Sequence, residues 1–168
     1  MPSPVIVVDY DPRWPHLFEA EKALLRHTLG DRITAIEHVG STAVPGLGAK
    51  PVIDIMAAVP RLALAAECVP LLASINYEYF PEYEKKIPER RFFRKGPADA
   101  RTHHLHIAEN TSDFWRWLVA FRDYLRAHPD IAREYERTKR AFAAQYGPNR
   151  DGYQDAKGPF IVGVVENL

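Results

Sequence analysis

Hydrophobic and polar positions follow two different periods along the chain, and the change of period separates a strand-rich part from a helical part. Residues 33–39 follow the period of two that predicts a strand. Residues 51–59 are apolar apart from Asp54, which is typical of a strand buried on both faces. The other predicted strands are the β-branched run 5–8 and three short segments, 77–80, 92–95 and 102–108.

Helical spacing appears near the N-terminus and dominates the last third of the chain. Residues 13–29 and 62–75 each predict a helix, the second one bent or restarted near Pro70. From Phe114 onward, apolar residues recur at i, i+3, i+4, i+7 and i+11, and Pro129 begins the next helix. A short last helix is expected to end near Glu166. The pattern therefore predicts an α+β fold with a helical C-terminal third.

Length and composition limit the class of protein. The chain has 168 residues with 46% hydrophobic and 26% charged residues, which indicates one globular domain over residues 1–168. Lys plus Arg and Asp plus Glu both number 22, so a strongly basic nucleic-acid-coating protein is excluded and nucleic acid is not an expected partner. No apolar run approaches the ~20 residues that span a bilayer. Because the N-terminus lacks a signal-peptide pattern and Cys68 stands alone, we expect a cytoplasmic protein without membrane contact.

A glycine-rich loop between two predicted strands carries the strongest chemical signal, with the sequence HVGSTAVPGLGAKPVIDI at 38–55. Glycine at Gly40 lets backbone N–H groups approach a phosphate, and the hydroxyls of Ser41 and Thr42 add donors. Lys50 is the best-placed single cation before the next strand. Asp54 suits a magnesium ion that bridges phosphates. The alternative is a Gly/Pro turn beside a solvent-exposed carboxylate, although an Asp within an apolar strand needs partners to offset its desolvation.

These motifs resemble the GrpB family. The resemblance is carried by GSTAVPGL at 40–47, AKP at 49–51 and IDI at 53–55, and by later pieces at 91–96, 104–106, 121–126 and Lys157. It implies a nucleotidyltransferase-like fold, a mixed twisted β-sheet with flanking helices, in which Gly-Ser at a strand end precedes a strand with metal-binding acids. It also implies similarity to a domain found fused to dephospho-coenzyme A kinase.

One position departs from the nucleotidyltransferase pattern. Those enzymes place two carboxylates at alternating positions of the strand that follows the loop, and here the position after Asp54 on the same face is Met56. Two-metal phosphoryl transfer needs several carboxylates. The chain therefore recruits other ligands, binds one metal, or binds a nucleotide without transferring it.

His104 and His106 are the candidates for such recruitment. They lie two residues apart on a predicted strand, so their rings share a face. If that strand neighbours the Asp54 strand, the three residues form a two-histidine, one-carboxylate set suited to a transition metal. We assign catalytic and metal-binding roles to Asp54, His104 and His106, with Mg²⁺ or Mn²⁺ as the expected cofactor and Zn²⁺ as an alternative. Hydrogen bonding to their surroundings, phosphate contact and acid–base chemistry remain open for the two histidines.

Residues 82–101 form a basic segment with seven Lys or Arg residues against four acids. Arg91 and Lys95 share one face of the predicted strand and are assigned to phosphate binding, beside the alternative of a solvated hairpin face. Tyr153 and Lys157 share a helical face and are expected to close over the site, beside the alternative of an ordinary helix surface. Arg122 is expected to link a helix to the sheet.

The leading hypothesis is a protein that binds a nucleotide or another phosphorylated small molecule, with metal-dependent nucleotidyl transfer as a further activity. The first alternative is a non-catalytic accessory or ligand-binding domain, which the missing carboxylate at Met56 favours. The second is a metal-dependent hydrolase that uses Asp54, His104 and His106. Fold analogy alone does not decide between these hypotheses, or whether the protein is an enzyme. The sequence does not reveal the oligomeric state.

Overall fold

Five strands form one mixed sheet in the order β1-β2-β5-β4-β3. The computed structural model describes residues 5–146, 149, 152–153, 157–159, 161 and 163. The strands are β1 (Ala35–Val39), β2 (Ile53–Ala58), β3 (Tyr77–Tyr79), β4 (Arg90–Lys95) and β5 (His103–Ala108), and the helices are α1 (Trp14–Leu29), α2 (Ala65–Ala73), α3 (Asp113–Ala127) and α4 (Pro129–Tyr146). Strands β2 and β5 pair in parallel at the centre, and the other pairs are antiparallel.

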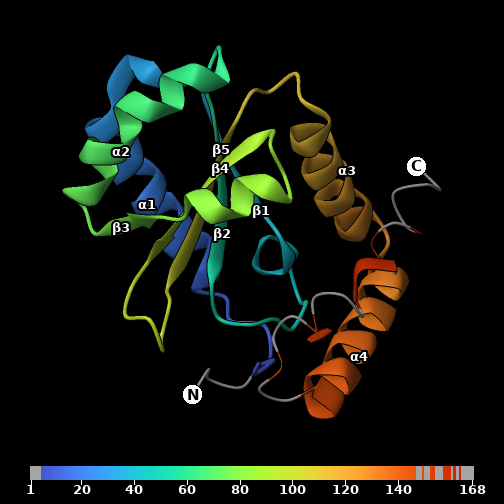
Figure 1. Cartoon of the computed structure of the whole chain (residues 1–168). Coiled ribbons are helices and arrows are strands. Elements are labelled where there is room, and N and C mark those ends of the chain that lie inside the picture. The colour runs from blue at the N-terminus through green and yellow to red at the C-terminus, as the bar shows by residue number, and fades with distance from the viewer. Residues whose placement is uncertain are drawn as a thin grey trace.

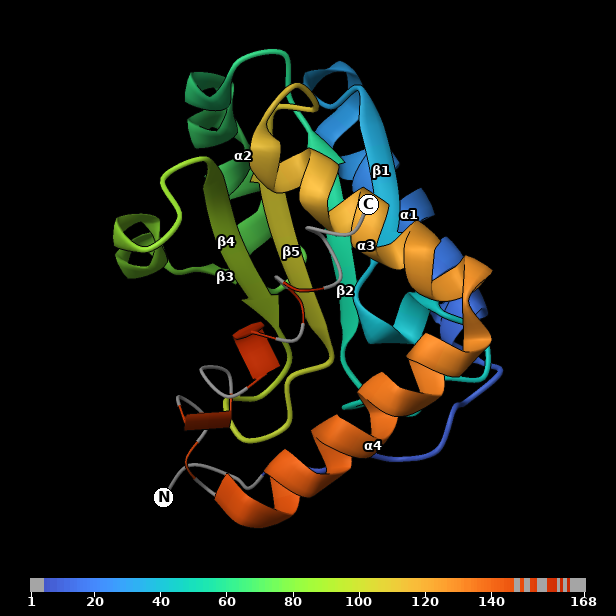
Figure 2. The same cartoon turned by 90° about the vertical axis from the view of Figure 1, so that its right-hand side faces the viewer.

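The sheet separates two layers of helices (Figure 1). Helices α1 and α2 pack on one face, where Ile55 and Leu105 are fully buried in the main apolar core. Helix α3 packs on the opposite face against Met56 and Ala58 through Trp115. Figure 2 shows α3 running across this second face and α4 running past the lower ends of the strands. We call these two sides the α1/α2 face and the α3/α4 face.

Local sequence explains where the main helices begin and end. Pro15 occupies the first turn of α1, and Gly30, with φ +58°, ends that helix. At the start of α3 the Ser112 hydroxyl accepts a hydrogen bond from the Trp115 backbone N–H at 3.2 Å. The fold is therefore α+β with a helical C-terminal region, as predicted.

One predicted strand is absent, and one predicted helix falls largely in a part of the chain that the structure does not describe. Residues 5–8 do not form a strand, since their pairing in the structure is a single bridge between Val8 and Ala49. The short run has no second partner there to extend a ladder. The expected last helix, ending near Glu166, falls largely outside the described residues.

None of the described helices has both the length and the apolar character needed to cross a membrane, and the cytoplasmic location stays a prediction.

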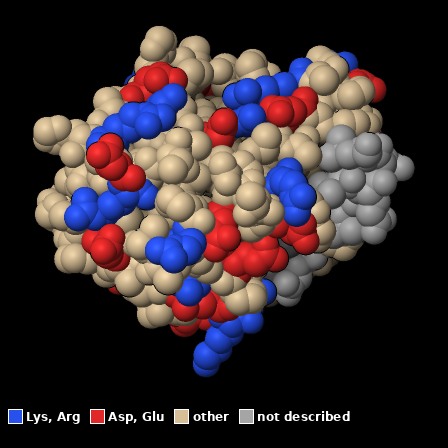
Figure 3. Space-filling model, turned by 90° about the horizontal axis from the view of Figure 1, so that it is seen from above, with Lys and Arg blue, Asp and Glu red and all other residues tan. Residues whose placement is uncertain are grey.

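Charged side chains of both signs are interspersed over the end of the molecule that Figure 3 shows. This distribution agrees with the equal numbers of basic and acidic residues in the sequence. Any specific recognition of an anion must therefore come from a local group of cations, and not from the net charge of the protein.

Candidate functional site

Asp54 lies directly against the Gly-Ser turn. The antiparallel register places Val39 opposite Asp54, so the turn that follows β1 passes over the carboxylate. Gly40 has φ +73°, and a Cβ at this position would lie 2.7 Å from Asp54 Oδ2. Both the backbone conformation and the close approach require glycine here. The loop and the carboxylate therefore form one unit.

The parallel pairing of β2 with β5 brings the two histidines to the same carboxylate. Asp54 is opposite His104 in the register, and Met56 is opposite His106. Asp54 Oδ1 lies 3.6 Å from His104 Nδ1 and 3.6 Å from His106 Nε2. The side chains are partly accessible, with exposed fractions of 33% for Asp54, 18% for His104 and 12% for His106. The predicted convergence of these three residues is present, while their chemical roles stay predictions.

Arg90 completes this group from the neighbouring strand. Its Nη1 lies 2.6 Å from His106 Nδ1. Because a guanidinium has only donors, His106 Nδ1 must accept, and the ring proton lies on Nε2, which faces Asp54. The Arg90 group also stacks on Phe92 and Phe114, and its buried Nε has no hydrogen-bond partner among the described residues. We call Gly40, Asp54, Arg90, His104 and His106 the Asp54 cluster.

The protonation states of the Asp54 cluster follow from burial and from these neighbours. Burial lowers the pKa of His106 to about 4, so this ring is neutral at neutral pH. Burial alone would raise the pKa of Asp54, but the facing groups of His104 and His106 hold it well below its usual value. Burial also lowers the pKa of Arg90 to about 10, which leaves the guanidinium charged. At neutral pH the Asp54 cluster thus contains an ionised carboxylate and a charged guanidinium.

The donor set fits one hard divalent cation better than a closed metal centre. The described part of the chain contains no group of three or more His, Cys, Asp or Glu side chains arranged to hold a metal ion. His106 Nε2 carries a proton as long as Arg90 donates to Nδ1, and a metal ligand must present a bare nitrogen. Mg²⁺ commonly uses one or two carboxylates together with substrate phosphates. Asp54 is the residue suited to that arrangement, and metal binding by His104 and His106 remains a prediction.

Met56 and Glu37 show why a second carboxylate does not join Asp54 here. Met56 is fully buried in the apolar cluster that contains Trp115. Glu37 is opposite Met56 in the register, but Arg122 Nη1 donates to Glu37 Oε2 at 2.6 Å and to the His38 carbonyl at 3.0 Å. Arg122 therefore links α3 to the sheet, as the sequence predicted. Its ion pair engages Glu37, the carboxylate opposite Met56.

The basic strand requires a correction. Phe92 pairs with His106, so the even-numbered residues of β4 share the face of Asp54, and Arg91 and Lys95 lie on the opposite face. Lys95 Nζ is bound to Glu21 Oε1 at 2.8 Å, and Arg91 forms an ion pair with Glu84 at 3.4 Å. The structure does not bring Arg91 or Lys95 to the Asp54 cluster.

Arg90 and Arg94 take the places that we expected for Arg91 and Lys95. The Arg94 guanidinium stacks on Phe80, Tyr83 and Phe92, and its Nη2 donates to the Tyr83 hydroxyl at 2.9 Å. The two faces of this strand were distinguishable in the sequence. Which of them faces Asp54 depends on the register with β5, for which the sequence holds no signal.

The remaining loop residues differ in their surroundings. Thr42 is buried, and its hydroxyl lies 2.9 Å from His38 Nε2, so it braces the loop instead of facing the Asp54 cluster. Ser41 Oγ accepts a hydrogen bond from Lys139 Nζ at 2.8 Å. Lys50 is partly buried and close enough to Lys139 to affect its charge state.

Sequence reasoning missed Lys139. The signal available was its spacing, because Lys139 lies four residues after Tyr135 and so on the apolar side of a helix.

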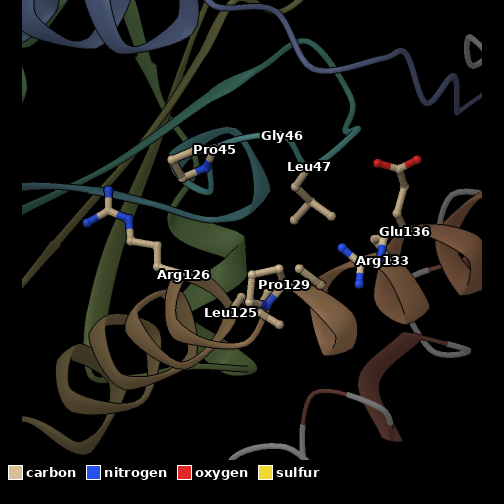
Figure 4. A pocket seen from close by; sticks show the side chains of 9 residues that line it. Pro45, Gly46, Leu47, Leu125, Arg126, Pro129, Arg133 and Glu136 are labelled. Atoms are coloured by element: carbon tan, nitrogen blue, oxygen red, sulfur yellow. The ribbon is translucent and has the colours of Figure 1, made fainter.

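A separate cavity of about 440 Å³ lies behind the loop, between its 45–47 segment and the junction of α3 and α4 (Figure 4). Leu47 and Leu125 line it, and both belong to the apolar cluster that joins the loop to the helices. Arg126 Nε donates to the Ala43 carbonyl at 2.9 Å. Helices α3 and α4 thus hold the loop in place from the side away from the sheet.

Comparison with known proteins identifies the family. The sequence profile described as GrpB protein matches residues 4–167. The chain belongs to the GrpB family. The crystal structure of the conserved protein GrpB from Enterococcus faecalis shares 35% sequence identity with it at a TM-score of 0.84, over 96% of this chain and 98% of that one.

Two curated relatives of this GrpB-family chain are about twice as long as the part that it matches. It is 36% identical to the UPF0157 protein YqkA of Bacillus subtilis over 97% of this chain, and it spans 47% of the length of that protein. It is also 31% identical to the dephospho-CoA kinase of Mycolicibacterium paratuberculosis, over 95% of this chain and 44% of that protein. The chain therefore spans about half the length of these relatives.

A distant structural likeness confirms the predicted fold type. The structure of Cid1 in complex with its short product ApU matches at a TM-score of 0.51 with 13% identity, over 79% of this chain and 40% of that one. The nucleotidyltransferase-like fold implied by the sequence motifs is thus present in the GrpB-family chain. At this level of identity the likeness concerns the fold alone.

Proposed function

We propose that this GrpB-family chain binds a nucleoside polyphosphate, or a phosphorylated metabolite of similar charge, at the Asp54 cluster together with one divalent cation. The observation that carries the proposal is the contact between the Asp54 carboxylate and the Gly40 turn, beside a guanidinium with a buried N–H that no described residue satisfies. A buried donor without a partner costs free energy unless a ligand satisfies it. A phosphate oxygen is a suitable acceptor for the Arg90 group.

Each residue has a role that its position supports. The backbone at Gly40 and Ser41 would donate to phosphate oxygens, since glycine allows close approach at this turn. Asp54 would share the cation with those oxygens, and the ion would neutralise phosphate charge. Arg90 would balance the remaining negative charge. His106 holds both Asp54 and Arg90 in orientation, because its two ring nitrogens face one group each.

Nucleotidyl transfer is the second candidate, and the fold likeness to Cid1 is the observation that favours it. The buried Met56 opposes it, because the position beside Asp54 holds no carboxylate for a second ion. We therefore propose binding as the primary activity and expect transfer to be slow. A non-catalytic accessory role fits the same site, and the match to part of a dephospho-CoA kinase supports it.

A thermal-shift panel tests the proposal. The purified chain is heated with nucleoside mono-, di- and triphosphates and with coenzyme A precursors, each with Mg²⁺, with Mn²⁺ and with EDTA. A ligand present at about 100 times its Kd adds about 2.7 kcal/mol to the free energy of unfolding. We expect the largest rise in Tm with a polyphosphate and a divalent ion together. An unchanged Tm across the whole panel would overturn the proposal.

A further inference from the structure

A buried lysine lies under the Gly-Ser turn with neutral partners. Lys139, on α4, is 2% exposed. Its Nζ donates to Ser41 Oγ and to the Gly48 carbonyl, each at 2.8 Å, and lies 4.8 Å from the centre of the Tyr135 ring. No ion pair of Lys139 occurs among the described residues. An ammonium buried among neutral groups is costly, and proteins normally pair it with a carboxylate.

Two further lysines are near enough to Lys139 to affect its charge state. Lys157 has its Nζ 5.3 Å from the centre of the Tyr153 ring, and it is partly buried. Burial, with repulsion from Lys157 and Lys50 opposed in part by Glu136, lowers the pKa of Lys139 to about 7. Burial and repulsion from Lys50 lower the pKa of Lys157 to about 8, although Asp54 acts in the opposite direction. We call Lys50, Lys139 and Lys157 the lysine cluster.

The lysine cluster adjoins the Asp54 cluster. Ser41, which Lys139 contacts, follows Gly40, which packs on Asp54. Lys157 is near enough to Asp54 for the carboxylate to stabilise its charge. The two clusters thus meet at one turn, where Gly40 packs on the carboxylate and Ser41 contacts a lysine.

We propose that the lysine cluster is the subsite for the terminal phosphates of the ligand, with Lys157 in contact with them and Lys139 as a positioning residue that acts through Ser41. The inference rests on the proposed function only in that the remainder of the ligand is placed at the Asp54 cluster. Lys139 fixes both ends of the 41–48 segment by its bonds to Ser41 and Gly48, and it adds positive charge beneath the turn. A polyphosphate supplies the anionic partner that no described residue gives to the buried ammonium.

The test uses inorganic tripolyphosphate and orthophosphate as probes, without nucleotide and in EDTA, so that no divalent ion takes part. Isothermal titration calorimetry compares the parent chain with Lys139→Met, Lys157→Met and the matched control Arg137→Met, whose side chain is exposed on the same helix. We expect tripolyphosphate affinity to fall about tenfold or more in each lysine variant, with a smaller loss for orthophosphate. Arg137→Met should stay within about twofold of the parent.

Thermal unfolding without ligand separates a ligand-directed lysine from a structural brace. We expect Lys139→Met to keep the parent Tm within about 3 °C or to raise it, because a buried cation is replaced by an apolar side chain of similar length. If Lys139→Met lowers Tm by more than about 3 °C and leaves tripolyphosphate affinity unchanged, Lys139 has a purely structural role and the positioning role is overturned. Lys157→Met provides the second, independent variant.

The outcomes for the two proposals can be distinguished. Tripolyphosphate binding that depends on the lysines, without stabilisation by any nucleotide, would support the subsite and overturn the proposed function. Nucleotide binding with unchanged tripolyphosphate affinity in both lysine variants would support the proposed function and overturn the subsite. If the parent chain does not bind tripolyphosphate, the subsite is also overturned.

Discussion

The two faces of the central sheet are built from alternate residues of the same strands, yet they differ in how their charges are arranged. On the α1/α2 face, Lys95 binds Glu21 at 2.8 Å, and Tyr77 donates to the same carboxylate at 2.8 Å. On the α3/α4 face, Asp54 lies 3.6 Å from two imidazoles, and Arg90 keeps a buried N–H without a partner among the described residues. On the first face the charged groups pair with one another, whereas the second contains a buried donor that no described residue satisfies.

Under the proposed function, this difference separates stability from binding on one sheet. The α1/α2 face contains the main apolar core, including Ile55 and Leu105, and its few charges pair with each other. The α3/α4 face contains a smaller apolar cluster around Met56 and Trp115, and the polar groups lie beside it. Substitutions one residue apart on a strand should therefore affect different properties.

Leu105→Ala should have the largest effect on stability. Leu105 is fully buried on the α1/α2 face between its neighbours in the main core. Removing its side chain atoms leaves a cavity, and the free energy of unfolding should fall by about 2–5 kcal/mol. Urea denaturation followed by circular dichroism measures this. A loss below about 1 kcal/mol would contradict the placement of the core on this face.

Adjacent arginines on β4 offer a sharper test of the two faces. Arg90→Met removes a cation beside Asp54 and His106, whereas Arg91→Met removes one whose partner is Glu84 on the other face. We expect the first change to weaken nucleoside triphosphate binding about tenfold, or about 1.4 kcal/mol, and the second to change it less than twofold. Calorimetric titrations measure both. Equal losses of affinity in the two variants would contradict the assignment of ligand binding to the face of β4 that carries Arg90.

The pH dependence of stability should reflect Lys139, a buried lysine with no ion pair among the described residues. The pKa of Lys139 is about 7 in the folded chain, while an unfolded lysine titrates near its usual value of 10.5. Between these values the unfolded chain holds more protons, so the free energy of unfolding rises with pH, by about 1 kcal/mol from pH 7 to pH 8. Repulsion from Lys50, Lys157 and Arg140 adds to the effect of burial, and Glu136 opposes it.

Urea denaturation at pH 7 and pH 8 should show this rise in the parent chain and a smaller one in Lys139→Met. The variant keeps the other titrating groups and therefore serves as the control. An identical rise in the variant would show that Lys139 is not the group responsible.

The sequence predicts much of the Asp54 cluster because its parts follow from local rules. Period two places His104 and His106 on one face of a strand, and an apolar run around Asp54 predicts a central strand. The sequence assigned Gly40 to close approach of a phosphate, and the structure shows that the Asp54 carboxylate is its close neighbour. Asp54 and the two histidines converge if their strands are neighbours, and β2 and β5 are paired in the structure.

Other parts of the site depend on contacts between distant segments. The assignment of Arg91 and Lys95 was wrong in position because the register between β4 and β5 decides which face meets Asp54. Lys139 contacts Ser41, which lies 98 residues earlier in the chain, and no local pattern specifies that pairing. A lysine on the apolar side of a helix was the available signal, and its meaning depends on where the helix packs.

Calorimetric titration of a nucleoside triphosphate into the parent chain and into Asp54→Asn, each with Mg²⁺ and with EDTA, tests the central claim most directly. Asparagine keeps the shape of the side chain and removes its charge. The account predicts that Mg²⁺ strengthens binding about tenfold or more in the parent chain and has no such effect in Asp54→Asn, while both chains keep a similar circular dichroism spectrum. Equal strengthening by Mg²⁺ in the two chains would contradict the assignment of the divalent cation to Asp54.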